Sequence, residues 1–193
     1  VGVFYNGKNY IRANSEKRTK PQTPTQKSNT TKFTFLNNFL ATFHPYINIG
    51  LKNSAKTMTP LNLAYSRNYK RTVTGSSPDF EIDYAQLIWS EGDLAPLQLP
   101  EITNLQPGWI RLSWQFFFDF NSRQSDQLLL LIYCPELGIT DGFIGETSRY
   151  KKKCNFQINP VMLGKHVHIY VSLNSVDRKR IANNQYLGAY LIN

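Results

Sequence analysis

Residues 108–133, GWIRLSWQFFFDFNSRQSDQLLLLIY, decide the fold. In the first half every second residue is apolar and the residues between them are mostly polar. This period of two predicts a β-strand with one buried face, because successive side chains of a strand point to opposite sides. The apolar residues on that face are Ile110, Leu112, Trp114, Phe116, Phe118 and Phe120. A polar turn follows, and the unbroken apolar run Leu128–Tyr133 predicts a central strand covered on both faces.

Strand patterns continue on both sides of this stretch. Toward the C-terminus, apolar residues alternate in 154–158 and 167–173, and a last strand is predicted at 186–192. Toward the N-terminus, residues 80–84 alternate, and 87–89 and 102–105 are short apolar runs. About seven strands separated by turns are typical of a β-sandwich.

Two helices are predicted before the strands. Thr23-Pro24-Thr25-Gln26 has the pattern of a capping box with proline in the first turn. Apolar residues follow at three- and four-residue spacing, and His44-Pro45 should end this helix, because the residue before proline is driven out of the α region. Thr59-Pro60 repeats the N-cap and proline pattern and predicts a second helix to about Val73. Residues 47–52, between the two predicted helices, are ambiguous.

The chain opens with a predicted hairpin. Two short β-prone runs, 1–5 and 8–12, flank Asn6-Gly7, the preferred dipeptide of a type I′ turn. A hairpin of this length is marginal in water and needs a sheet to join. The polar, basic residues 13–22 that follow predict an extended connector.

Two resemblances accompany these patterns. Leu112-Ser113-Trp114, Leu131-Ile132-Tyr133, Leu163-Gly164-Lys165 and Asn183–Leu187 resemble a fibronectin type III module, although Ile169 stands where such modules have a tyrosine. The opening VGVFYNGKNYIRA, then TPTQ, INIGLK and the near-terminal NQYLG resemble a family of uncharacterised proteins of about this length, common in Bacteroidota. That family has no assigned function, so the resemblance implies no catalytic residues.

The predicted fold class is α+β, mainly β. Residues 1–75 form a basic N-terminal hairpin arm plus two helices, and residues 76–193 form an immunoglobulin/fibronectin-like antiparallel β-sandwich body. Cys134 and Cys154 flank a glycine-containing loop. They either pair, if their strands are neighbours, or remain two buried thiols.

Charge is segregated along the chain. The 22 Lys and Arg residues exceed the 13 acids and give a net charge of +9. Residues 1–75 hold 12 of the basic residues and only Glu16 as an acid, whereas Ser76–Ile110 holds six acids and no Lys or Arg. This asymmetry indicates an anionic partner, such as nucleic acid or a membrane surface, or complementary packing between copies; a solvated basic face is the simpler alternative.

The motifs of common enzyme classes are absent from the sequence. It has no GxSxG, Walker loop, HExxH or GxGxxG, and we predict no catalytic residue, no cofactor and no metal ligand. His166 and His168 lie two apart on a predicted strand, so both imidazoles point to one face, as metal ligands on strands do. The positions of the other His, Cys and acidic residues do not indicate a third ligand. Two histidines on a solvent-facing side of the strand are the simpler interpretation.

The preferred functional hypothesis is a non-enzymatic structural subunit that self-assembles as a filament, surface or particle component. A basic arm that adds strands to a neighbour would satisfy its backbone hydrogen bonds and match charge to charge. The arm residues are Val3, Tyr5, Lys8, Tyr10, Arg12, Lys17, Arg18 and Lys20. The acidic acceptor surface is Asp79, Glu81, Asp83, Glu91 and Asp93.

Two other functions stay open. The basic arm and its tyrosines suit a nucleic-acid-binding protein, since cations neutralise phosphates and rings stack on bases. The second is a metal-dependent enzyme or metal-binding protein that uses His166 and His168. No apolar run reaches the roughly 18 to 20 residues that span a bilayer. The compartment is left open, with a cell-surface, extracellular or particle-associated location favoured for a self-assembling subunit.

Overall fold

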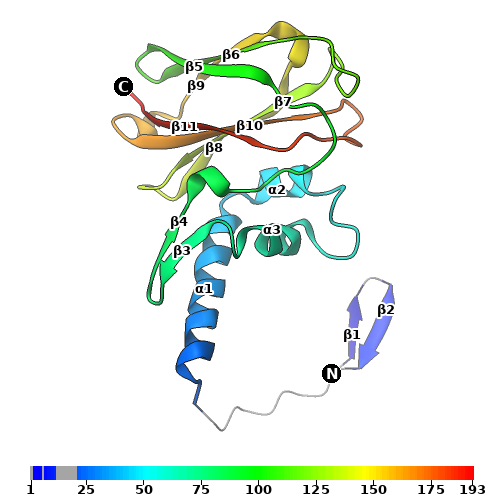
Figure 1. The fold of residues 1–193 in the computed structure, drawn as a ribbon, viewed down its shortest axis with the longest axis vertical. Coiled ribbons are helices and arrows are strands. Elements are labelled where there is room, and N and C mark those ends of the chain that lie inside the picture. Colours follow the sequence, from blue (N-terminus) through cyan, green and yellow to red (C-terminus); the bar gives the residue numbers. More distant parts are fainter. Residues whose placement is uncertain (1, 6, 12–20) are drawn as a thin grey trace.

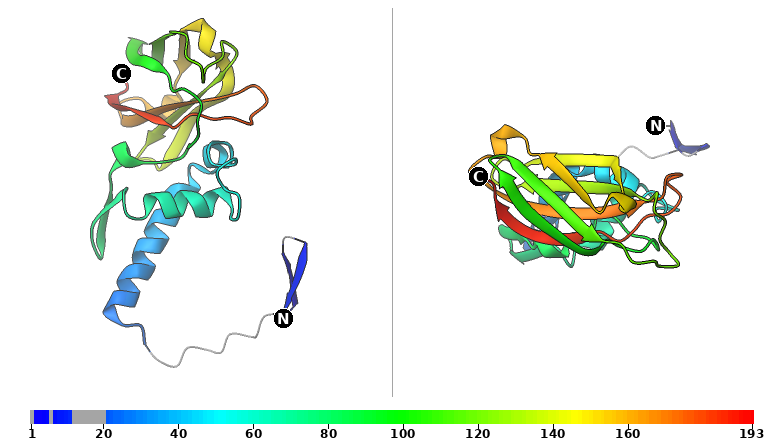
Figure 2. Two further views of the ribbon diagram at one scale, coloured as in Figure 1. Left: turned by 45° about the vertical axis from the view of Figure 1, so that its right-hand side comes forward. Right: turned by 90° about the horizontal axis from the view of Figure 1, so that it is seen from above.

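The computed structural model describes residues 2–5, 7–11 and 21–193. A layer of helices, a four-stranded sheet and a three-stranded sheet are stacked on one another, and the hairpin β1–β2 lies outside these layers (Figure 1). Figure 2 shows the same layering from two further directions. The predicted fold class, α+β and mainly β, is confirmed.

The two sheets of the sandwich are antiparallel throughout. One has the order β11-β10-β7-β8 and the other the order β5-β6-β9. Their strands are β5 (Gln98–Gln106), β6 (Trp109–Gln115), β7 (Gln127–Cys134), β8 (Ile139–Ser148), β9 (Lys153–Gln157), β10 (His166–Asn174) and β11 (Gln185–Leu191). Short 3-10 turns lie at η1 (Tyr84–Gln86), η2 (Arg149–Lys151) and η3 (Pro160–Met162). The sequence predicts a sandwich correctly, but not all of its strands: β8 is not predicted as a strand, and the residues predicted as strands before residue 90 lie outside the two sheets.

Strand β7 is buried on both faces, as predicted from its unbroken apolar run. Leu128, Leu130 and Ile132 pack into the core between the two sheets. Leu129 and Leu131, which point the other way, pack against the helices in a second core. The helices are therefore a covering layer of the sandwich, because the outer face of the four-stranded sheet is buried beneath them.

Three helices form this layer: α1 (Pro24–Ala41), α2 (His44–Gly50) and α3 (Pro60–Asn68). The predicted capping box is present, with Thr23 and Gln26 bonded reciprocally. The prediction of two helices is wrong, because the ambiguous stretch around residue 47 belongs to a separate helix, α2. Pro45 sits in the first turn of that helix, where a missing N–H costs nothing.

A second hairpin, β3 (Val73–Ser76) and β4 (Asp79–Ile82), follows α3. It crosses the boundary predicted between residues 75 and 76. Val73 is buried in the helical core, and Phe80 and Ile82 pack against that core. The second helix ends at Asn68 rather than near Val73, because the chain turns there into β3.

The strand predicted at 87–89 does not form. Its backbone bonds instead to two asparagine side chains. Asn68 accepts from the N–H of Ile88 at 2.8 Å and donates to its carbonyl at 2.7 Å. Asn184 accepts from the N–H of Trp89 at 3.0 Å and donates to the carbonyl of Leu87 at 2.8 Å. The segment is apolar because Leu87 and Trp89 fill the helical core, and no ladder is needed to satisfy its polar groups.

The strand predicted through residue 120 is also wrong in its second half. Strand β6 ends at Gln115, opposite Gln98 at the start of its partner β5, and its other partner β9 begins only at Lys153, opposite Ser113. Beyond that point no strand in the described part of the chain continues the ladder, so Phe118 and Phe120 face solvent with 85 % and 87 % of their surface exposed. Their expected burial was inferred from alternation alone.

The cysteines lie in different sheets, Cys134 in β7 and Cys154 in β9, and both are free. Burial raises the pKa of the Cys154 thiol to about 11, with opposing contributions from the backbone of Leu112 and the charge of Lys151. The Cys154 thiol is therefore neutral and unreactive near pH 7. Among the described residues, none of the helices has the length and apolarity needed to cross a bilayer.

Candidate functional site

The N-terminal hairpin pairs β1 (Gly2–Tyr5) with β2 (Lys8–Ile11) in antiparallel register. Gly7 in the turn has φ +74°, a conformation that glycine adopts without a steric penalty. Phe4 is paired with Asn9, and Gly2 with Ile11, so Phe4 and Ile11 share one face. Phe4 is 72 % exposed and Ile11 96 %. This face is apolar and has no cover within the described chain.

The predicted arm residues fall into two groups. Val3, Tyr5, Lys8 and Tyr10 lie on the strands of the hairpin, and the Tyr10 side chain is 49 % exposed. Arg12, Lys17, Arg18 and Lys20 lie outside the described residues. The pairing of Val3 with Tyr10 and of Tyr5 with Lys8 places the first group along one short two-stranded ribbon.

The predicted acidic surface divides between two places. Asp79 and Glu81 are exposed on β4, and Asp83 accepts a hydrogen bond from the backbone N–H of Ala85 at 3.1 Å. Glu91 instead receives two bonds from Arg67, at 2.7 and 2.9 Å. Asp93 lies 3.0 Å from Arg180, and the hydrogen bond from that guanidinium lowers the Asp93 pKa. The uncompensated part of the surface is therefore on β4.

His166 and His168 point to the same side of β10, as predicted, but only one is exposed. The His168 ring stacks on Tyr84 with centroids 3.9 Å apart, and its Nδ1 lies 2.8 Å from the Tyr186 hydroxyl. Burial lowers the His168 pKa, and the charge of His166 lowers it further. Within residues 2–5, 7–11 and 21–193, no three His, Cys, Asp or Glu side chains converge on one point.

Two polar pockets lie where the helical layer meets the sandwich. One, of about 330 Å³, is lined by residues that include Arg71, Gln86 and Asn184. The other, of about 480 Å³, includes Asn53, Asp93 and Arg180. Asn184 bonds the backbone at Leu87 and Trp89, and Asn53 bonds the carbonyls of Arg178 and Lys179. These amides hold loops in place, which is a structural role.

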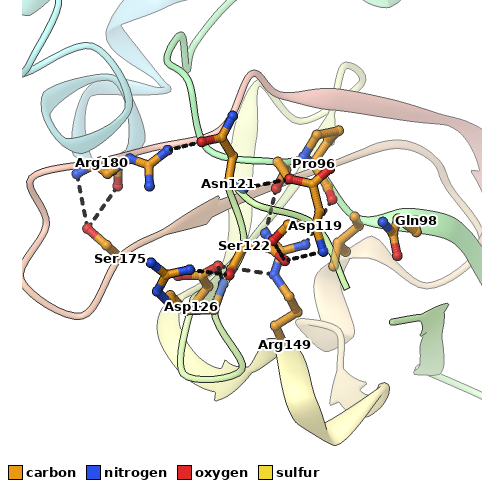
Figure 3. Close-up of polar contacts among 12 residues, drawn as sticks. Pro96, Gln98, Asp119, Asn121, Ser122, Asp126, Arg149, Ser175 and Arg180 are labelled. Atoms are coloured by element: carbon orange, nitrogen blue, oxygen red, sulfur yellow. Dashed lines mark hydrogen bonds and ion pairs between the residues drawn. The ribbon is translucent and has the colours of Figure 1, made fainter. Parts of the chain in front are cut away.

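A buried ion pair, which sequence reasoning missed, joins the loop after β6 to η2. Arg149 Nε lies 3.1 Å from Asp126 Oδ2, and each side chain is 1 % exposed. Arg149 also donates to the carbonyls of Ala95 and Pro96, while its own carbonyl accepts from the indole of Trp114 at 2.8 Å. Figure 3 shows this network together with Asp119, Asn121 and Ser122.

Removing one partner of such a pair lowers stability strongly, because the remaining buried charge is left unpaired. Burial lowers the Arg149 pKa against the opposing effect of Asp126. No local pattern could have revealed it, since the partners are 23 residues apart and each is an isolated charge. Its position shows that the loop of residues 116–126 is held firmly at its base.

The chain is similar to a protein family and to solved structures. Among curated proteins, none matches the sequence. Among solved structures, the fibronectin type III domain of the human collagen alpha-1(XX) chain is similar over 53 % of this chain and 88 % of that domain, with 13 % identity and a TM-score of 0.35. The family of unknown function DUF6266 matches residues 1–188. Since that match spans nearly the whole sequence, the chain belongs to the DUF6266 family.

Proposed function

We propose that this protein is a non-enzymatic structural subunit that assembles with copies of itself by adding its N-terminal hairpin to a neighbour. The observation that supports this is the exposure of Phe4, Tyr10 and Ile11 on a hairpin that supplies no described residue to either hydrophobic core. The cores include residues of the helices, the second hairpin and both sheets, whereas Phe4, Tyr10 and Ile11 of the first hairpin belong to neither core.

Strand addition meets the needs of such a hairpin. Two strands alone are marginally stable in water, and a third strand adds both a ladder and a covered face. Each outer edge of β1–β2 presents backbone N–H and C=O groups that a sheet edge in another molecule can pair. Burying Phe4 and Ile11 at the contact would stabilise it by about 1.5–3 kcal/mol each.

The acceptor that fits best is the open edge of β4. In the described part of the chain β4 pairs only with β3, so its other edge has no strand beside it. Asp79 and Glu81 are exposed on β4. Their charge is opposite to that of the arm, because the first 75 residues contain 12 basic residues and one acid. The arm and β4 are different surfaces, so the contact is heterologous and repeats into a filament or a closed ring.

Light scattering tests the proposal. We expect the full chain to form larger species with rising concentration, and removal of residues 1–20 to leave a monomer, because both hydrophobic cores lie within residues 36–192. The double variant Phe4→Ser/Ile11→Ser should behave like the truncation. Val161→Ser/Val176→Ser, which removes two apolar side chains 56 % and 59 % exposed elsewhere, is the matched control. The proposal is contradicted if all four proteins are equally monomeric at every salt and protein concentration.

The same proteins separate the two alternatives. A monomer whose full-length form shifts a labelled oligonucleotide, with a steep dependence on salt, supports nucleic-acid binding by the arm. Stoichiometric zinc, copper or iron in the purified protein, lost in a His166→Gln/His168→Gln variant, supports a metal site. Neither result is expected of a subunit whose contacts are strand pairing and charge between copies.

A further inference from the structure

The loop between β6 and β7 displays apolar side chains with no cover. Phe117, Phe118 and Phe120 are 57 %, 85 % and 87 % exposed. Leu99, 67 % exposed, is beside them, because the adjacent Gln98 side chain accepts the N–H of Phe117 at 2.6 Å. We call Leu99, Phe117, Phe118 and Phe120 the aromatic prong. A patch of this kind on a folded surface usually marks an interaction site.

The base of the prong is braced by polar contacts (Figure 3). Asn121 accepts from the N–H of Ala95 through its carbonyl at 3.0 Å, and from Arg180 through its side chain at 3.1 Å. Asp126 accepts from the N–H of Arg123 at 2.7 Å while it is paired with buried Arg149. The base of the loop is therefore fixed, and the Phe118 and Phe120 rings stay almost fully exposed among the described residues.

Basic residues surround the prong. Lys151, Lys152 and Lys153 are exposed and lie beside the end of β6, since Trp114 donates its N–H to the carbonyl of Lys152 at 2.9 Å. Arg123, on the prong loop, is also exposed. The acids close by are Asp119, whose carboxylate accepts the N–H of Asn121 at 2.7 Å, Asp126 in its buried ion pair, and Glu101 on β5, opposite Ser113. Asp93 is also near, but it is paired with Arg180, which itself bonds Asn121. Exposed positive charge outweighs exposed negative charge here.

We infer that the prong docks on an anionic phospholipid surface, with the phenylalanine rings entering the acyl boundary and the four cations contacting headgroup phosphates. Apolar side chains and basic residues on one face are the combination that binds membrane interfaces. The arm of a second copy does not fit this surface, because both are basic. Rings that stack on bases form platforms along a charged groove, whereas Phe118 and Phe120 project almost fully into solvent.

The test uses the full chain and vesicles of phosphatidylcholine with or without phosphatidylserine. We expect sedimentation with the phosphatidylserine vesicles, and at least about a hundredfold weaker association for Phe118→Ser/Phe120→Ser, which removes two rings from the acyl boundary. Val161→Ser/Val176→Ser, which removes two exposed apolar side chains elsewhere, should bind as the parent does. Lys151→Ala/Lys153→Ala should weaken binding about fivefold per lysine.

The basic arm also attracts anionic vesicles, so a readout local to the prong is needed. In Phe118→Trp, the new indole should shift its emission to the blue on binding and be quenched by brominated acyl chains. Equal binding of parent and Phe118→Ser/Phe120→Ser, with no shift in Phe118→Trp, overturns the inference. So does a shift caused by a single-stranded oligonucleotide or by protein self-association, when vesicles cause none.

Discussion

The two β-hairpins of this protein have the same size and opposite surroundings. Both β1–β2 and β3–β4 pair four residues with four. Val73 of the second hairpin is 5 % exposed, and Phe80 and Ile82 pack on the helical core. Phe4 and Ile11 of the first hairpin are 72 % and 96 % exposed. Only the second hairpin is stabilised by contacts within the described chain.

We propose that this difference reflects the role of each hairpin. A two-stranded ribbon gains little from its own ladder, so its stability comes from the surface on which it packs. The second hairpin has that surface in the helices, and its role is to close the helical core. The first hairpin carries apolar residues that would stabilise it only against another surface, which we assign to a second copy of the chain.

The largest effect is expected from placing a carboxylate on the buried hairpin. Val73→Asp should lower the free energy of unfolding by about 4 kcal/mol, because it buries an unpaired charge. Ile11→Asp should change it by less than about 0.5 kcal/mol, since the side chain is exposed, yet it should abolish assembly. Urea denaturation and light scattering of both variants check this. Equal destabilisation by the two substitutions would contradict the difference between the hairpins.

A somewhat smaller loss is expected where the second hairpin is tied to the helices. Asn68 is fully buried and also accepts from the Thr72 hydroxyl at 2.8 Å, immediately before β3. Asn68→Leu leaves buried backbone groups of Ile88 without partners, so we expect a loss of about 2–3 kcal/mol. Asn62→Ala, at an exposed position of the same helix, is the control. An unchanged melting temperature in Asn68→Leu would show that this link is not needed.

Charge reversal on β4 should separate assembly from stability. Asp79→Lys/Glu81→Lys should weaken assembly about tenfold at low ionic strength, because like charges would then face each other. Its melting temperature should match that of the parent, as both side chains are exposed. Glu101→Lys/Glu146→Lys makes the same change in net charge on other strands. If the two double variants assemble equally well, β4 is not the acceptor.

The smallest effect concerns pH. The folded protein holds the His168 pKa below its usual value of 6.5, chiefly by burial, so the unfolded chain binds this proton more tightly. Stability should therefore be complete above pH 6.5 and decrease as pH falls toward the lowered pKa. Because His168 stacks on Tyr84, just after β4, acid should loosen the second hairpin and leave the first unchanged. His168→Gln, but not His166→Gln, should remove this dependence in urea titrations.

The sequence predicts the elements whose local pattern and tertiary surroundings agree. The predictions of β7 and of the Thr23 capping box are correct, because burial on two faces and helix capping each require a local sequence pattern. Residues 116–120 alternate as a strand does, yet the ladder stops at Gln115, because the partner strand β5 begins at Gln98 opposite it. Alternation cannot show the length of a partner strand.

The candidate sites follow the same rule. The hairpin could be predicted from Asn6-Gly7, because the turn dipeptide determines its geometry locally. The pairing of Glu91 with Arg67 and of Asp93 with Arg180 could not, since the partners come together only in the folded chain. The aromatic prong could not be predicted either, because Phe118 and Phe120 fit a buried face in the pattern.

Hydrogen exchange of the β1–β2 amides at two protein concentrations tests the central claim most directly. A hairpin that pairs with a neighbouring copy should be unprotected in dilute solution and gain protection as assembly proceeds, while the β7 amides stay protected throughout. Protection of β1–β2 that is the same at every concentration, whether high or absent, would contradict strand addition between copies.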